Sequence, residues 1–214
     1  MIKKEFCAEN FTRVPEAIEL GADRIELCDR LDVGGITPSI EVIEETVAYA
    51  RQRGVEVVVM IRPRGGSFIY SEAEKEHMKK EARQAIDLKA DGVVFGCLTE
   101  DGDIDKPIVS ELIRIADFKQ TVFHMAFDAI PEEKQLESLN WLIEQGCTRI
   151  LTRGAASGSA LENKAAIIDL IEKSEGQIEI LPGGGLTHEN LEQARVEIPA
   201  TQFHGTKIVP LPGF

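Results

Sequence analysis

Residues 21–28 read Gly-Ala-Asp-Arg-Ile-Glu-Leu-Cys, a passage in which a helical pattern gives way to a short apolar strand. Similar joints recur at residues 89–93 (Lys-Ala-Asp-Gly-Val) and 146–150 (Gly-Cys-Thr-Arg-Ile). They precede the second, fourth and sixth strands that the sequence predicts, so the pattern returns every two units. A weak repeat of this kind indicates one structural module used many times. We therefore predict a chain of similar strand–helix units.

Short runs of β-forming residues alternate with helical patterns from one end of the chain to the other. Several runs are almost continuously apolar, which is typical of parallel strands covered by helices on both faces. The predicted strands are Ile2–Ala8, Arg24–Cys28, Val55–Ile61, Gly92–Cys97, Thr121–His124, Arg149–Thr152, Ile178–Leu181 and Thr201–His204. We predict one α/β domain over residues 1–214, a (β/α)8 TIM-type barrel. A doubly wound open sheet is the alternative.

Local signals mark the ends of several predicted helices. Ser71 with Glu74, and Ser159 with Glu162, have the spacing of a capping box, in which each residue satisfies a free amide of the other. Gly54 and Gly146 stand where helices should stop.

The chain has little sequence left after the eighth predicted strand. Residues 205–214 contain Pro210 and Pro212 and cannot build a full helix. We predict a barrel without its eighth outer helix, and an exposed apolar strip between the first and seventh helices. Burial of that strip would favour a homodimer.

Composition excludes several classes of function. The apolar share is 43% and the charged share 29%, which is typical of a globular protein. A net charge of −13 disfavours nucleic-acid partners and anionic membranes, because few cations are left to neutralise phosphates. No apolar run has the length of a membrane-spanning helix. The four cysteines are widely spaced beside apolar runs, which suits reduced thiols, so we expect a cytoplasmic protein.

Polar residues gather where the first two predicted strands end. Alternation along a strand puts Glu5 and Cys7 on one face, and Glu26 and Cys28 on one face of the next strand. In a (β/α)8 barrel the active site forms at these strand ends. The alternatives are structural: the carboxylates could pair with Arg62 or Arg24 inside the barrel, and the thiols could be core residues.

The later strands end in further candidates for the site. Arg62 and Arg64 could clamp a carboxylate or phosphate, or form an interior salt-bridge network. His124 and His204 each follow a phenylalanine at a predicted strand end, although a core histidine is the alternative, and Asp128 lies close behind His124. The glycines of residues 183–185 precede a predicted helix start at Thr187, so their amides could bind an anion; a tight turn is the alternative.

Several of these stretches resemble the copper homeostasis proteins of the CutC family. The matching stretches are Glu5-Phe6-Cys7, residues 21–28, Gly34-Gly35-Ile36-Thr37-Pro38-Ser39, Ile61-Arg62-Pro63-Arg64-Gly65-Gly66, Tyr70-Ser71, Leu98-Thr99-Glu100-Asp101-Gly102, Phe123-His124, Ala126-Phe127-Asp128, Pro182-Gly183-Gly184-Gly185 and Phe203-His204. The resemblance spans essentially the whole chain. It implies a cytoplasmic (β/α)8 barrel that handles copper, with Cys7 and Cys28 matching the two cysteines proposed as ligands. Two positions depart from the family pattern: Met125 replaces an arginine, and Arg153 replaces a serine.

Two functions follow from these observations. In the first, which the resemblance favours and which we expect, Cys7 and Cys28 bind Cu(I), with Met125 or His124 as a further ligand. In the second, which the residues by themselves favour, the chain is an enzyme that performs acid–base chemistry on a small anionic metabolite. The catalytic candidates are then Glu5 or Glu26 as proton acceptor, His124 as acid, Arg62 as clamp, and Asp128. The anion-binding candidates are Arg64, Gly183, Gly184, Gly185 and His204.

Overall fold

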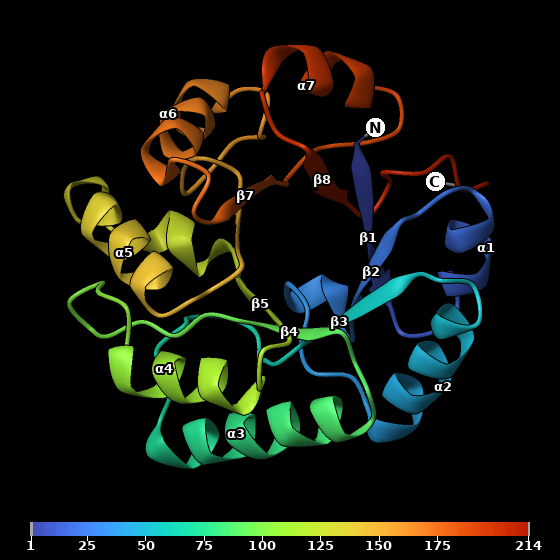
Figure 1. The fold of residues 1–214 in the computed structure, drawn as a ribbon, viewed down its shortest axis with the longest axis horizontal. Coiled ribbons are helices and arrows are strands. Elements are labelled where there is room, and N and C mark those ends of the chain that lie inside the picture. Colours follow the sequence, from blue (N-terminus) through green and yellow to red (C-terminus); the bar gives the residue numbers. More distant parts are fainter. Residues whose placement is uncertain (1, 214) are drawn as a thin grey trace.

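Eight parallel strands form a nearly closed barrel inside a ring of helices (Figure 1). The computed structural model describes residues 2–213. The strands are β1 (Lys3–Glu9), β2 (Arg24–Cys28), β3 (Glu56–Met60), β4 (Gly92–Phe95), β5 (Gln120–Phe123), β6 (Arg149–Thr152), β7 (Glu179–Pro182) and β8 (Gln202–Gly205). All eight predicted strands are confirmed, with small shifts at their ends.

The order of the strands decides between the two predicted architectures. Each strand pairs with the next along the chain from β1 to β7, and β8 returns to pair with β1. A doubly wound sheet would instead reverse its strand order at an inner strand. Between β7 and β8 a single parallel bridge joins Thr187 to Lys207, beyond the ends of both strands. The barrel prediction is therefore confirmed.

Within the described residues, seven α-helices cover the barrel, and their boundaries follow local chemistry. They are α1 (Val14–Glu19), α2 (Ile40–Arg51), α3 (Glu72–Asp87), α4 (Lys106–Ile115), α5 (Glu132–Glu144), α6 (Lys164–Ser174) and α7 (Leu191–Glu197). Ser71 and Glu74 form the predicted capping box of α3. Ser159 and Glu162 make the same reciprocal bonds, but α6 begins only at Lys164, so this box closes the turn before the helix.

Side chains alternate between two cores along every strand. The outward residues, such as Ile25 and Leu27, pack under the helices. The inward residues fill the barrel, with an apolar side made of Val58, Met60, Val94, Val122, Leu151 and Leu181. Cys7 and Cys28 belong to this inner cluster. The candidate site therefore lies inside a packed barrel and not in an open channel.

The C-terminal segment occupies the place of the missing helix. The described residues after β8 form turns, which confirms that an eighth helix is absent there. The prediction of an exposed apolar strip is wrong, because Ile208, Val209 and Leu211 are buried and cover it. Arg13, just before α1, donates a hydrogen bond to the Pro212 carbonyl oxygen, and Figure 1 shows this segment running from β8 towards α1. The homodimer stays a prediction, but this strip no longer supports it.

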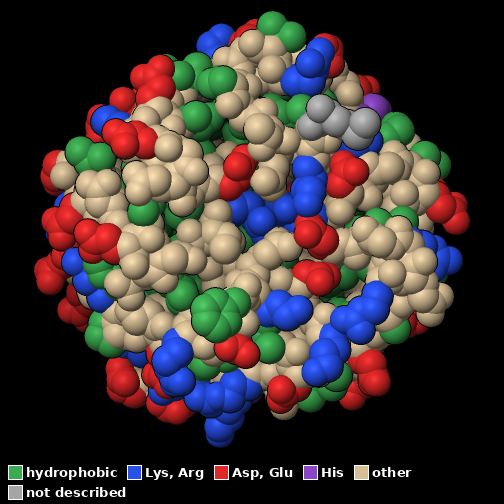
Figure 2. Space-filling model, viewed as in Figure 1, with side chains coloured by type: hydrophobic (Ala, Val, Ile, Leu, Met, Phe, Trp, Pro, Cys, Tyr) green, Lys and Arg blue, Asp and Glu red, His purple; other side chains and the backbone are tan. Residues whose placement is uncertain are grey.

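The distribution of charge on the surface agrees with the acidic composition of the chain. Figure 2 shows basic and acidic side chains interspersed on the face in view, including its centre, without an extended basic field. Within residues 2–213, every helix is too short or too polar to cross a membrane.

Candidate active and metal site

A buried ion pair forms the base of the candidate site. The register of β1 and β2 places Glu5 opposite Arg24, and both side chains are at most 1% exposed. Arg24 donates from Nε to Glu5 and from Nη2 to the Gln202 side-chain oxygen at 2.6 Å. Burial opposes ionisation of Glu5, but Arg24 and His204 outweigh it and lower its pKa to about 2. Of the two arginines that the sequence left open, Arg24 is the partner of Glu5.

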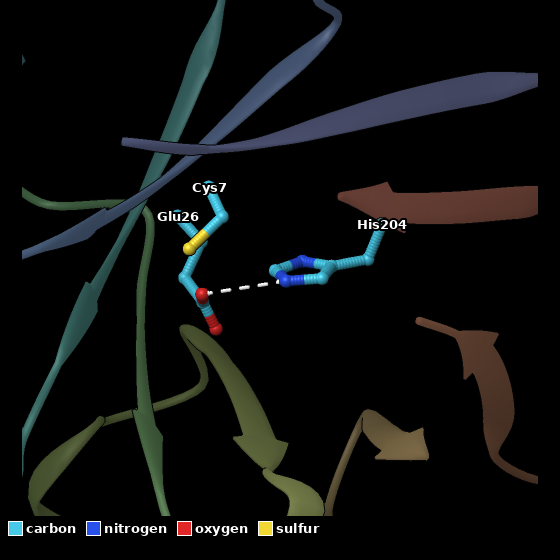
Figure 3. A group of neighbouring side chains, drawn as sticks. All are labelled: Cys7, Glu26 and His204. Carbon is cyan, nitrogen blue, oxygen red and sulfur yellow. Dashed lines mark ion pairs between the residues drawn. The ribbon is translucent and has the colours of Figure 1, made fainter. Parts of the chain in front are cut away.

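His204 lies between two carboxylates of different character. β8 pairs with β1 so that His204 is opposite Glu5, and its Nδ1 is 2.8 Å from Glu5 Oε1. On the other side, its Nε2 is 3.7 Å from Glu26 Oε2 (Figure 3). Burial disfavours the imidazolium, yet Glu26, Cys7 and Glu5 together raise the pKa of His204 well above its usual value. His204 is therefore protonated at neutral pH, with Nδ1–H donated to Glu5.

Cys7 completes a group of three possible metal ligands. Its sulfur, a carboxylate oxygen of Glu26 and a ring nitrogen of His204 all lie within 4.8 Å of one another. Figure 3 shows the three side chains converging from β1, β2 and β8. Cys28 lies beside this group, with its Sγ 3.6 Å from Glu26 Oε2. The fold thus brings both predicted thiols to one place inside the barrel.

Both thiols are protonated in the ligand-free protein. The neighbouring Cys28 thiol, burial and the Glu26 carboxylate raise the pKa of Cys7 well above its usual value. Cys7 acts to lower the pKa of Cys28, but burial and Glu26 outweigh it and raise the pKa of Cys28 to about 11. Nucleophilic chemistry needs a thiolate, so this environment does not activate either cysteine as a nucleophile.

Glu26 has one buried carboxylate oxygen without a hydrogen-bond partner. Its side chain is almost fully buried, and Oε1 has no hydrogen-bond partner. Burial, helped by the nearby negative charge of Glu5, raises the pKa of Glu26 even though His204 opposes the shift. A buried carboxylate oxygen without a partner is costly unless it binds a proton or a ligand.

The other two cysteines lie in different surroundings. Cys97 contacts the Met78 sulfur in the outer core, and Cys147 contacts the backbone oxygens of Thr121 and Arg149. They are ordinary core thiols.

The predicted third metal ligands, Met125 and His124, are engaged elsewhere. Met125 packs against the inner cluster, and Arg153 Nη2 lies 3.3 Å from its sulfur. This contact shows that Arg153 occupies the space beside position 125, where the family pattern has an arginine. His124 accepts a backbone hydrogen bond from Ala126 through Nδ1. The sequence did not predict Glu26 and His204 as neighbours of Cys7; it indicated an anion-binding role for His204 and a catalytic role for Glu26. Their approach to Cys7 depends on strand pairing, which the sequence does not reveal.

The two predicted clamp arginines hold loops instead of Glu5 or Glu26. Arg62 donates to the carbonyl oxygens of residues 33, 34, 35 and 66, which joins the loops after β2 and β3. Arg64 pairs with Glu74 at 2.6 Å and donates to the carbonyl oxygens of Ser67 and Ile69. Its role in anion binding stays a prediction, although these partners already occupy its donors.

Asp128 ties two neighbouring units of the barrel together. It lies in the short 3-10 helix Met125–Ala129 after β5, and it accepts hydrogen bonds from the Thr152 hydroxyl and, at 3.0 Å, from the Arg153 amide. Burial raises its pKa even though these donors oppose the shift. It is close to β6, away from the group of Cys7, Glu26 and His204.

The glycine loop after β7 is placed differently from its prediction. The helix expected at Thr187 begins only at Leu191, so no helix N-terminus follows the glycines directly. Gly183 donates its amide to the Thr152 oxygen, and Gly184 lies so close to Arg153 that a Cβ there would be 3.0 Å from that side chain. Gly184 and Gly185 have φ values of +87° and +73°, which supports the role of a tight turn. Anion binding by Gly183, Gly184 and Gly185 stays a prediction.

Comparisons with known proteins agree along the whole chain. The sequence pattern of the CutC family matches residues 2–209. A CutC protein of Enterococcus faecalis is 49% identical over 207 residues, which cover 96% of this chain and 99% of that protein. The human copper homeostasis protein cutC homolog is 44% identical over 200 residues, or 94% of this chain and 71% of the human protein. A solved CutC structure from Streptococcus agalactiae superposes with a TM-score of 0.94 at 41% identity, covering 98% of this chain and all of that one.

Proposed function

This chain belongs to the CutC family, and from that premise we propose that it binds Cu(I) inside the barrel, through the thiolates of Cys7 and Cys28. Copper enters the proposal through the human relative, whose name assigns it to copper homeostasis. The observation that carries it is the convergence of Cys7 with the His204 ring nitrogen inside 4.8 Å, beside Cys28.

The donor types fit a soft ion. Cu(I) prefers thiolate sulfur and accepts imidazole nitrogen. Cys7 and Cys28 supply the sulfurs, and His204 supplies Nε2 once its proton has left. The carboxylate of Glu5 would keep the Nδ1–H of His204 in place, as outer carboxylates do for metal-bound histidines.

The strand register favours an ion between the sulfurs over a disulfide. Cys28 is opposite Glu9, two residues beyond Cys7. With strands ~4.8 Å apart and a rise of ~3.3 Å per residue, the two Cα atoms are about 8 Å apart. A disulfide requires Cα atoms within ~6.8 Å of each other. The thiols can therefore share an ion more easily than a covalent bond.

Replacing single cysteines tests the copper proposal. Anaerobic competition against a Cu(I) chelator should give one ion per chain for the unchanged protein. Cys7→Ser and Cys28→Ser should each weaken binding by at least about 100-fold, since each removes half of the thiolate donors. Cys97→Ser is the matched control, because that thiol is buried against Met78 in the outer core. Equal affinity in the Cys7→Ser variant and the unchanged protein would refute the site.

A second candidate function rests on the pair of Glu26 and His204. A carboxylate with a raised pKa and an unpartnered oxygen, next to a protonated imidazole, is suited to general acid–base chemistry on a small anionic metabolite. In this case Glu26→Gln abolishes turnover, whereas Cys7→Ser leaves metabolite binding largely intact. The same variants therefore separate the two proposals.

A further inference from the structure

A second group of buried polar side chains lies outside the group of Cys7, Cys28, Glu26 and His204. Arg62 follows β3 and His124 follows β5, so both stand at the strand ends where barrel sites form. Tyr70 ends the loop after β3. All three are at most 5% exposed, and each has one buried polar atom without a hydrogen-bond partner: Arg62 Nε, Tyr70 Oη and His124 Nε2. We call these three residues the donor cluster.

Arg62 is a buried cation without a carboxylate partner among residues 2–213. Both of its terminal nitrogens donate to backbone carbonyl oxygens, which are neutral. Its Nε–H remains unused. A buried charge is normally balanced by an opposite charge, because the protein interior solvates it poorly. The surroundings of Arg62 therefore favour an anion.

His124 can only donate from its free nitrogen. Its Nδ1 accepts the Ala126 amide hydrogen bond at 3.1 Å, so in the neutral ring the proton is on Nε2. Burial and the positive charge of Arg62 lower the pKa of His124 to about 3, which keeps the ring neutral. Its Nε2–H is thus a fixed and unused donor.

One aromatic ring, that of Phe68, lies close to two members of the donor cluster. The centroid of Phe68 is 5.0 Å from the guanidinium carbon of Arg62 and 5.0 Å from the ring centroid of His124. Tyr70 is close enough to Arg62 for the guanidinium to act on its hydroxyl, although burial dominates and raises the pKa of Tyr70. Phe68 is half-buried.

We propose that Arg62, Tyr70 and His124 bind the carboxylate or phosphate group of a small metabolite through Arg62 Nε, Tyr70 Oη and His124 Nε2. Arginine and this histidine tautomer can only donate there, and the tyrosine hydroxyl can donate as well. Three donors and one uncompensated positive charge select an oxyanion over a cation or a neutral ligand. The site shares no residue with Cys7, Cys28 and His204, so it stands whether or not copper binds.

Nuclear magnetic resonance of the His124 ring nitrogens tests the proposal on the intact protein. Inorganic phosphate and acetate are titrated separately at constant ionic strength, with chloride as the reference anion. We expect a saturable shift of the Nε2 resonance, and the tighter of the two probes distinguishes a phosphate from a carboxylate ligand. Tyr70→Phe should weaken binding about tenfold, the usual effect of losing one hydrogen bond to a charged group.

The chain offers a matched control in its only other tyrosine. Tyr49 lies on α2, and its ring contacts Phe11 and Arg53 outside the barrel. Tyr49→Phe should therefore leave the anion affinity unchanged. Equal affinity in Tyr70→Phe and the unchanged protein would mean an adventitious ion only and would overturn the proposal. Absence of any His124 shift with both probes would overturn it too, since an ordered water would then satisfy the donors. Arg62 is not the variant of choice, because its loss would also free the two loops that it holds.

Discussion

His124 and His204 show how the surroundings of a side chain set its charge. Both are almost fully buried, but His204 touches carboxylates on two sides while His124 faces a guanidinium and a backbone amide. Desolvation lowers the pKa of both rings, and only His204 has negative neighbours that reverse the effect. One histidine is therefore a cation that a metal must deprotonate, and the other is a neutral donor.

The charge state of His124 predicts a pH dependence of stability. In the unfolded chain a histidine titrates near 6.5, whereas the pKa of folded His124 is about 3. The contribution of neutral His124 to the free energy of unfolding is complete above pH 6.5 and is lost as the pH falls towards 3. Over this range the unfolded state binds a proton at His124 and the folded state does not. The loss is about 1.4 kcal/mol per pH unit, or about 2 kcal/mol at pH 5.

Urea unfolding of His124→Gln checks this expectation between pH 7 and pH 5. The variant should lose about 2 kcal/mol less than the unchanged protein over that range. His188→Gln, which changes an exposed histidine, is the matched control. Identical slopes for all three proteins would show that folding does not lower the pKa of His124.

Among the elements, α3 holds the loop that carries two residues of the donor cluster. Its capping box joins Ser71 to Glu74, and Glu74 in turn pairs with Arg64 of the loop after β3. This loop carries Arg62 and Tyr70, two members of the donor cluster. The start of α3 therefore anchors the loop that positions them.

Ser71→Ala should destabilise the protein by about 1 to 2 kcal/mol, because it removes a cap and half of a box. Ser39→Ala is the matched control: Ser39 caps α2 with one long bond of 3.4 Å to the Val42 amide, so its loss should cost less. Chemical denaturation measures both. A smaller cost for Ser71→Ala than for Ser39→Ala would contradict the importance of the box.

At the scale of the whole molecule, the C-terminal segment covers the barrel at the place where the described residues form no eighth α-helix. Its buried side chains, Ile208, Val209 and Leu211, take the place of the apolar face that an eighth helix would supply. A few residues are enough to cover the barrel here, because the segment lies between α7 and α1 (Figure 1).

Ile208→Ala should therefore behave as a core substitution and cost about 2 to 4 kcal/mol of unfolding free energy. Val196→Ala changes a side chain that is 74% exposed on α7 and should stay within about 0.5 kcal/mol of the unchanged protein. Light scattering of the same samples tests the homodimer. A monomer at micromolar concentration would exclude it, and equal stability of the two variants would show that the segment does not seal the barrel.

The sequence by itself determined the elements and their order. Strand runs such as Arg24–Cys28, the Ser71 box and the turn at Gly146 depend on neighbours a few residues away, so local patterns are enough to predict them. Alternation also predicted that Cys7 and Cys28 share the inside of the barrel. The prolines at positions 210 and 212 also predicted that residues 205–214 would not form a full helix.

Only the tertiary structure decided how the site is paired. Glu5 and His204 are 199 residues apart, and they meet because β8 closes onto β1 in one register. A shift of that register by one residue would turn His204 out of the barrel. The choice of Arg24 over Arg62 and the approach of Glu26 to Cys7 depend on the register of β1 with β2, and the burial of Ile208 depends on the packing of the C-terminal segment. Contacts of this kind arise from packing between distant segments, and no local pattern in the chain contains them.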